Sequence, residues 1–215
     1  MPRLWCGMRF LDLDALRRTP AATDPFPYVV VPGFVSEAAR ADLAGDFPAV
    51  EQPGSFPVET LRLGSIFAAF LRELEGEEFR AAMSAKLAID LEGRPTMVTV
   101  RGQARPSDGG IHADSKTKLV TVLIYMNETW ETEGGRLRLL RSPDNLEDMV
   151  TEVPPDAGTL LAFQVTPHSW HGHASVSGPR RALQLNWVRD ESVVRRERRR
   201  HGISAKMKRL LDFAR

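Results

Sequence analysis

Two short stretches, GGIHADSKTK and SWHGHASVSGPRRALQLNW, contain side chains of the kinds that bind metals in proteins. His112 and Asp114 stand one residue apart in the first stretch, and His171 and His173 lie in the second. Residues i and i+2 of a strand face the same side, so we expect the side chains of His112 and Asp114 to point together. His168 follows a proline just before the second stretch and is expected in a loop, with a structural role.

Two imidazoles and one carboxylate can occupy one face of a metal octahedron and leave three positions open. The HxD pair would supply two of these ligands, and the third would come from the WHGH segment. An HxD pair alone is weak evidence, because a solvated or core imidazole is the ordinary alternative for each histidine. The spacing therefore indicates a metal site but does not establish one.

Composition places the 215 residues in one globular domain, with 42% hydrophobic and 27% charged residues. Apolar segments are too short to span a bilayer, and the N-terminal stretch MPRLWCGMRFLDLDALRR mixes charged with apolar residues, unlike a signal peptide. The single cysteine, Cys6, excludes an internal disulfide and fits a reducing compartment. We expect a cytoplasmic protein.

The first 95 residues are predicted to form one short strand and several helices. The strand spans 28–31, and a helix capped by Ser36 follows it and ends at Gly45 or Pro48. Apolar residues at helical spacing predict two further helices, over 65–74 and 77–91.

After Pro95 the sequence changes to short strands separated by turn signals. The predicted strands are TMVTVRG, KLVTVLIYMN, GGRLRLL, DMVTEV, GTLLAF, SWHGHASV and ALQLNWV. Short strands at close, even spacing favour a sandwich or barrel. We predict a mainly β (α+β) fold, with N-terminal helices packed on a jelly-roll or double-stranded β-helix core. Within a single domain, 1–215, residues 1–95 would give support, 96–188 the catalytic core and 189–215 a basic tail.

The net charge of +1 conceals this basic tail. Residues 189–209 contain nine Lys or Arg against three acidic residues. Such a segment can be a solvated helix or can contact an acidic partner. It has no interleaved aromatic residues, and it contains no nucleic-acid-binding motif.

Residues 98–188 resemble the prolyl 4-hydroxylase-like branch of the 2-oxoglutarate and Fe(II)-dependent dioxygenases. The ordered motifs that carry the resemblance are HxD, a strand ending in YMN, GG, VPPDAGTLLAF, a distal histidine and GPRRALQLNW. The segment PFPYVVVPGF is a weaker match to the usual opening of the family. The resemblance implies the cofactor Fe(II) and the co-substrates 2-oxoglutarate and O₂.

Carried onto this chain, the resemblance implies His112 and Asp114 as the first two iron ligands and His171 as the third. His171 lies ten residues before Arg181, and His173 is the alternative, since it would share a strand face with His171. A carboxylate at Asp114 occupies the position that an iron halogenase leaves free for chloride. Hydroxylation is therefore favoured over halogenation.

Arg181 is the residue that the resemblance assigns to the distal carboxylate of 2-oxoglutarate. A guanidinium forms two parallel hydrogen bonds to a carboxylate, and strand alternation allows only one of Arg180 and Arg181 to face inward. Arg181 lies six residues before Trp187, the family's offset, so we expect Arg181 to face inward and Arg180 outward. Tyr125 would add its hydroxyl to the same carboxylate, or would be a core aromatic.

Four further residues, Lys116, Lys118, Arg101 and Gln103, are either contacts near the site or ordinary solvated side chains.

The resemblance implies hydroxylation of an unactivated C–H bond, with formation of succinate and CO₂, and leaves a peptidyl residue and a small molecule open as substrate. A non-enzymatic cupin-like protein that binds a metal or ligand is the alternative.

Overall fold

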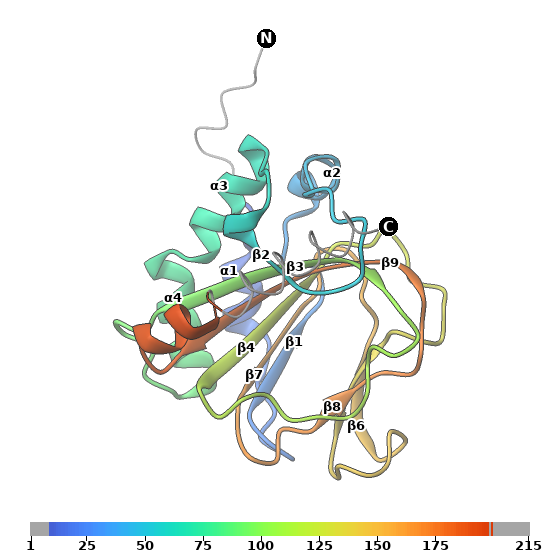
Figure 1. Ribbon diagram of the computed structural model, residues 1–215. Coiled ribbons are helices and arrows are strands. Elements are labelled where there is room, and N and C mark those ends of the chain that lie inside the picture. Colours follow the sequence, from blue (N-terminus) through green and yellow to red (C-terminus); the bar gives the residue numbers. More distant parts are fainter. Residues whose placement is uncertain (1–8, 198, 200–215) are drawn as a thin grey trace.

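The structure is a computed structural model that describes residues 9–197 and residue 199 (Figure 1). Its helices are α1 (Leu13–Arg18), α2 (Glu37–Gly45), the 3-10 turn η1 (Val58–Thr60), α3 (Ser65–Leu74) and α4 (Glu77–Leu87). Its strands are β1 (Tyr28–Val31), β2 (Phe56–Pro57), β3 (Thr96–Ala104), β4 (Lys118–Tyr125), β5 (Leu137–Leu140), β6 (Met149–Val153), β7 (Leu160–Gln164), β8 (His171–Gly172) and β9 (Gly178–Val188).

The strands form two sheets in which neighbouring strands are antiparallel. The large sheet has the order β1-β7-β4-β9-β3-β2, and the small sheet has the order β6-β5-β8. Strands that are neighbours in the large sheet are distant in sequence, as in a jelly roll. The predicted mainly β core with N-terminal helices packed on it is confirmed.

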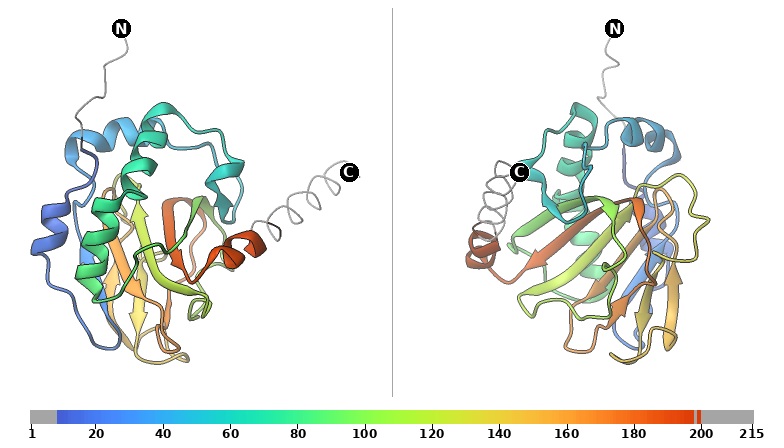
Figure 2. Two further views of the ribbon diagram at one scale, coloured as in Figure 1. Left: turned by 90° about the vertical axis from the view of Figure 1, so that its left-hand side faces the viewer. Right: turned by 45° about the vertical axis from the view of Figure 1, so that its right-hand side comes forward.

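One face of the large sheet is covered by the N-terminal helices, which lie across it in Figure 2. Alternate residues of β3, β4 and β9 are buried against apolar side chains of α3 and α4. On β9 these residues are Leu183, Leu185 and Trp187, and the Trp187 ring lies 5.7 Å from that of Phe79. This face of the sheet forms the larger hydrophobic core.

The opposite face of the large sheet looks toward the small sheet. A second, smaller core lies between the two, built from residues of β4, β7 and β9 and of β5 and β6. Its buried members are Phe26, Tyr125, Leu137, Leu139, Val153, Leu161, Phe163 and Ala182. We call the face of the large sheet that is turned toward the small sheet the inner face, because it lines the interior of the β core.

Local predictions for the N-terminal half are largely confirmed, with two corrections. The strand over 28–31 and the helix over 65–74 have the predicted bounds. The next helix ends at Leu87, because Ala88 adopts a left-handed conformation with φ 51°. Ser36 stands at the start of α2, but its hydroxyl donates to the carbonyl of Arg9 instead of capping the helix.

The predicted strand SWHGHASV is mostly wrong. Only His171 and Gly172 are in strand conformation, and the residues on either side of them form loops. His112 and Asp114 also lie in a loop, where only His112 makes an isolated β-bridge. The site is therefore built from loops that the two sheets hold in place.

Within the described residues, no helix is long and apolar enough to cross a membrane. Residues 198 and 200–215 of the predicted basic tail lie outside the described residues. The division of the chain at residues 95 and 188 stays a prediction.

Helix α3 receives its N-terminal cap from another element. Gly64 precedes the helix and has no side chain to offer, and Asp46 Oδ2 accepts the backbone N–H groups of Ile66 at 2.9 Å and Phe67 at 2.8 Å. A Cβ at Gly64 would lie 1.6 Å from Asp46 Oδ1, so the approach requires glycine. A carboxylate in this place satisfies two otherwise unpaired donors and is favoured by the helix dipole.

We predict that Asp46→Ala destabilises the protein by about 1–2 kcal/mol, a fall in Tm of roughly 2–8 °C. Thermal unfolding measures the change. Asp42→Ala, one turn earlier in α2, is the control and should alter stability by less than about 0.5 kcal/mol. Equal effects of the two substitutions would show that Asp46 does not cap α3.

Candidate active site

Three predicted metal ligands meet at one point. One ligand atom each from His112, Asp114 and His171 lies within 4.8 Å of the others. The backbones of His112 and His171 form an antiparallel bridge, with N–H to carbonyl distances of 3.0 and 2.9 Å. Directly opposed residues of such a bridge project to the same side, and the two imidazole centroids are 4.3 Å apart.

Backbone carbonyls hold both imidazoles in one orientation. His112 Nδ1 lies 2.8 Å from the carbonyl oxygen of Gly110, and His171 Nδ1 lies 2.9 Å from that of Ser169. Because a carbonyl only accepts hydrogen bonds, each Nδ1 carries the proton. Each Nε2 is left with a lone pair that can bind a metal, as in metal centres whose histidines are oriented by a second partner.

Asp114 is a buried carboxylate that is held ionised. Its Oδ1 accepts from Lys118 Nζ at 2.7 Å, and its Oδ2 accepts from the Thr121 hydroxyl at 2.6 Å. Burial alone would raise the pKa of Asp114, but the charge of Lys118, together with His171 and these hydrogen bonds, outweighs burial and holds the pKa below its usual value. Asp114 is therefore negative at neutral pH.

His171 is a buried neutral base. Burial lowers its pKa to about 4, against the opposing effect of the Asp114 charge. An imidazole with this pKa is unprotonated at neutral pH, as metal binding requires.

His173 and His168 lie outside the cluster. His173 is buried, its Nδ1 lies 2.9 Å from the carbonyl oxygen of Ala174, and burial together with the charge of Arg180 lowers its pKa. His168 is exposed, as expected of a loop residue. Of the two histidines considered for the distal position, the structure brings His171, and not His173, to His112 and Asp114.

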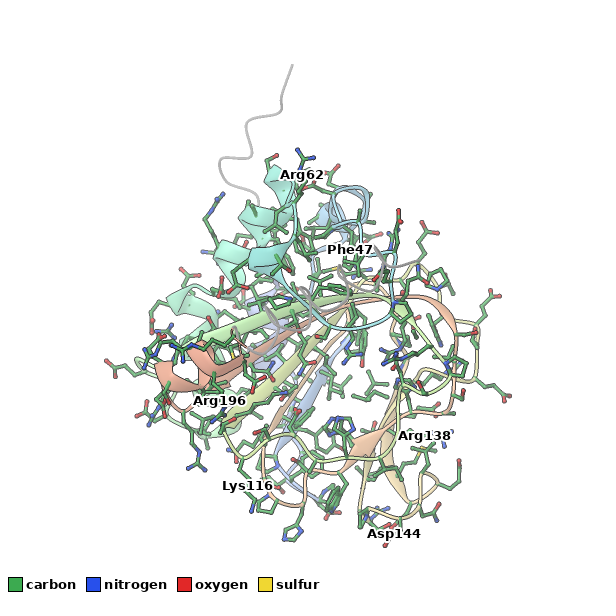
Figure 3. All side chains as sticks on the ribbon, in the orientation of Figure 1. Phe47, Arg62, Lys116, Arg138, Asp144 and Arg196 are labelled. Atoms are coloured by element: carbon green, nitrogen blue, oxygen red, sulfur yellow. The ribbon has the colours of Figure 1, made fainter. Side chains whose placement is uncertain are left out.

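The predicted orientation of the two adjacent arginines is wrong. Arg180 is buried on the inner face, where its Nε donates to the carbonyl of Gly135 at 2.9 Å and its guanidinium carbon lies 5.5 Å from the centroid of the Tyr125 ring. Arg181 is exposed on the opposite face, with its guanidinium 5.3 Å from the ring of Phe47, which is labelled near α2 in Figure 3.

The error has a geometric cause. Trp187 and Arg181 are an even number of residues apart and do share a face, but that face packs against the helices. The inner series on β9 is Arg180, Ala182, Gln184 and Asn186. The Gly-x-Arg element of the resemblance also ends at Arg180, since Gly178 and Pro179 precede it.

Tyr125 is fully buried on the inner face beside Arg180. Within the described residues its hydroxyl has no hydrogen-bond partner. Burial raises its pKa, although the Arg180 charge acts in the opposite direction. The phenol is therefore protonated at neutral pH and has a free donor.

The two lysines predicted as possible contacts near the site lie in different places. Lys118 is bound to Asp114, and Lys116 is an exposed residue on the loop before β4 (Figure 3). Sequence reasoning missed Thr121, which also holds Asp114. Its even spacing from Tyr125 along β4 places both side chains on the inner face, a signal that could have found it.

Part of the chain that includes this site matches a known protein family. The family profile described as the 2OG-Fe(II) oxygenase superfamily matches residues 103–189, which include all three clustered ligands and both arginines. A search of curated proteins found no relative by sequence.

Several solved structures share the fold. A Pseudomonas putida prolyl-4-hydroxylase has 18% identity and a TM-score of 0.55, over 83% of this chain and 97% of its own. HygX from Streptomyces hygroscopicus, with nickel and 2-oxoglutarate bound, has 13% identity and a TM-score of 0.53, over 79% and 84%. A Trichoplax adhaerens prolyl hydroxylase in complex with a hypoxia inducible factor peptide fragment has 15% identity and a TM-score of 0.55, over 82% and 88%.

The predicted double-stranded β-helix is thus the fold of these neighbours. Together, the match over residues 103–189, the shared fold and the His-Asp-His cluster make this part of the chain similar to the 2OG-Fe(II) oxygenases, enzymes that use Fe(II), 2-oxoglutarate and O₂.

Proposed function

We propose that His112, Asp114 and His171 bind Fe(II) and that the enzyme hydroxylates an unactivated C–H bond of a peptidyl residue or a small molecule. The observation that carries the proposal is the convergence of the three ligand atoms within 4.8 Å. Two imidazoles and one carboxylate are the donor set of non-haem Fe(II) oxygenases and leave three positions open. When bound, iron with 2-oxoglutarate and O₂ supplies the oxidation, with succinate and CO₂ as co-products.

Two groups of this chain fit the co-substrate. The Arg180 guanidinium forms no ion pair with any described residue, although it is buried. The nearby Tyr125 hydroxyl is a buried donor without a partner. A carboxylate between them would accept from both, so we propose Arg180, in place of Arg181, and Tyr125 as the site of the distal carboxylate of 2-oxoglutarate.

The presence of Arg180 and Tyr125 also favours a 2-oxoglutarate-dependent enzyme over a non-enzymatic metal-binding protein. A protein that only holds a metal has no use for a buried carboxylate-binding pair beside its ligands, and burying an unpaired cation is unfavourable unless a ligand compensates it.

The proposed reaction is tested by incubating the purified protein with Fe(II), 2-oxoglutarate and a cell extract in air. We expect succinate to form and mass spectrometry to reveal a component whose mass has increased by one oxygen atom. Asp114→Ala is the matched control and should give neither result. Succinate formation that is equal with Asp114→Ala would contradict the assignment.

A first prediction concerns the distal ligand. His171→Ala should lose the weak visible charge-transfer band that Fe(II) and 2-oxoglutarate produce together under anaerobic conditions, because two protein ligands hold the metal poorly against water. His173→Ala should keep the band, since the ring of His173 lies outside the cluster. The opposite pattern would assign the ligand to His173.

A second prediction concerns the co-substrate. Arg180→Ala should leave Fe(II) binding intact and weaken 2-oxoglutarate binding by roughly 30- to several-thousand-fold, which corresponds to about 2–5 kcal/mol for removing one member of a buried charge pair. Titrating 2-oxoglutarate into the Fe(II)-loaded protein measures the change. Arg181→Ala, on the opposite face, is the matched control and should bind 2-oxoglutarate like the parent. Equal affinities in the parent and Arg180→Ala would overturn this assignment.

A further inference from the structure

Arg101 lies on the inner face in the same cross-strand row as Tyr125. The register pairs Arg101 of β3 with Ala182 of β9, and Ala182 in turn with Tyr125 of β4. Directly paired residues of antiparallel strands project to one face. Arg180, two residues before Ala182, belongs to the same face.

The neighbours of Arg101 on β3 confirm this orientation. Val100 is buried in the core under the helices. A Cβ at Gly102 would lie 2.1 Å from the carbonyl oxygen of Val50, so Gly102 faces the segment that packs outside the large sheet. With the residues on either side facing outward, the Arg101 side chain extends toward the site.

Arg101 is a half-buried cation without a partner of its own among the described residues. Its guanidinium makes no hydrogen bond or ion pair of ordinary length with the described residues, and burial lowers its pKa. The negative charge of Asp108 is the largest effect that opposes this lowering of the Arg101 pKa, but the Asp108 carboxylate is already bound to Arg105 at 3.0 Å. Asp114 acts on Arg101 as well, and it is already bound to Lys118.

The ligands of the proposed function do not neutralise Arg101. Lys118 balances Asp114, and the two charges of Fe(II) balance the two of 2-oxoglutarate, whose distal carboxylate would contact Arg180. The inner face beside the cluster is then left with an excess of positive charge. A site with such an excess attracts and retains an anion.

Resting on the proposed function, we infer that Arg101 binds an anionic group, a carboxylate or a phosphate, of the primary substrate. Its planar guanidinium can offer two parallel donors to either group. Thr99 and Gln184, paired in the next inner-face row, add polar side chains beside it. The substrate class is thus a carboxylate- or phosphate-bearing molecule or residue, held with a C–H bond near the iron ligands.

The test uses the full chain loaded with Mn(II), a paramagnetic stand-in for Fe(II), and with 2-oxoglutarate. Methyl phosphate and acetate, each at millimolar concentration, are the probes, and the relaxation of their protons reports binding close to the metal. We expect at least one probe to be relaxed by the parent protein. In Arg101→Gln its affinity should fall by at least about 10-fold, as for removal of a charged partner.

Two variants make the result specific. Arg101→Lys keeps the charge without the two-pronged donor and should recover part of the affinity, and Arg181→Gln, on the opposite face, should behave like the parent. The probe that responds distinguishes phosphate from carboxylate. The inference is overturned if neither probe is relaxed by the parent, or if Arg101→Gln binds the probe as the parent does.

Binding of Mn(II) and 2-oxoglutarate is measured first in each variant. If Arg101→Gln loses 2-oxoglutarate affinity instead of probe affinity, Arg101 belongs to the co-substrate, and this inference fails while the proposed function stands. If the parent binds neither Mn(II) nor 2-oxoglutarate, the proposed function fails and this inference fails with it.

Discussion

The site depends on one short contact, the antiparallel bridge between His112 and His171. Two backbone hydrogen bonds join a loop after β3 to the two-residue strand β8, and β8 is held in turn by β5 of the small sheet. Backbone bonds of this kind fix the relative position of two segments that are far apart in sequence. The local carbonyl partners of the two imidazoles then bind each Nδ1 and leave each Nε2 free.

The large sheet carries two functions on its two faces. Outward residues of β3, β4 and β9 are apolar and join the core under α3 and α4. Inward residues of these strands include charged and polar side chains, which an interior accepts only where partners or ligands satisfy them. The helical layer can thus supply much of the apolar burial, while the inner face is left free for chemistry.

Much of this could be predicted from the sequence, since most strands, most helices and the three residues of the His-Asp-His cluster follow from local patterns and from the order of motifs. The choice between Arg180 and Arg181 could not. Alternation says that adjacent residues face opposite sides, but it does not say which side is the interior. Trp187 was a misleading reference, because a large aromatic side chain suits a core beneath helices as well as a core inside a barrel. The loops around β8 were also beyond prediction, because the packing of the two sheets, and not local propensity, decides where that short strand ends.

The pairing of the charged side chains on the inner face indicates that they serve to bind ligands and do not stabilise the fold. Asp114 has Lys118 and Thr121 as partners, so the carboxylate of the candidate metal site is satisfied by the protein itself. Among the described residues, Arg180 and Arg101 form no ion pair with a carboxylate. Holding two guanidinium groups near one another in a partly buried site destabilises the protein: burial and, to a smaller extent, the charge of Arg180 lower the pKa of Arg101. Such an arrangement destabilises the fold but strengthens anion binding. It is expected in a site that was selected to bind its ligands.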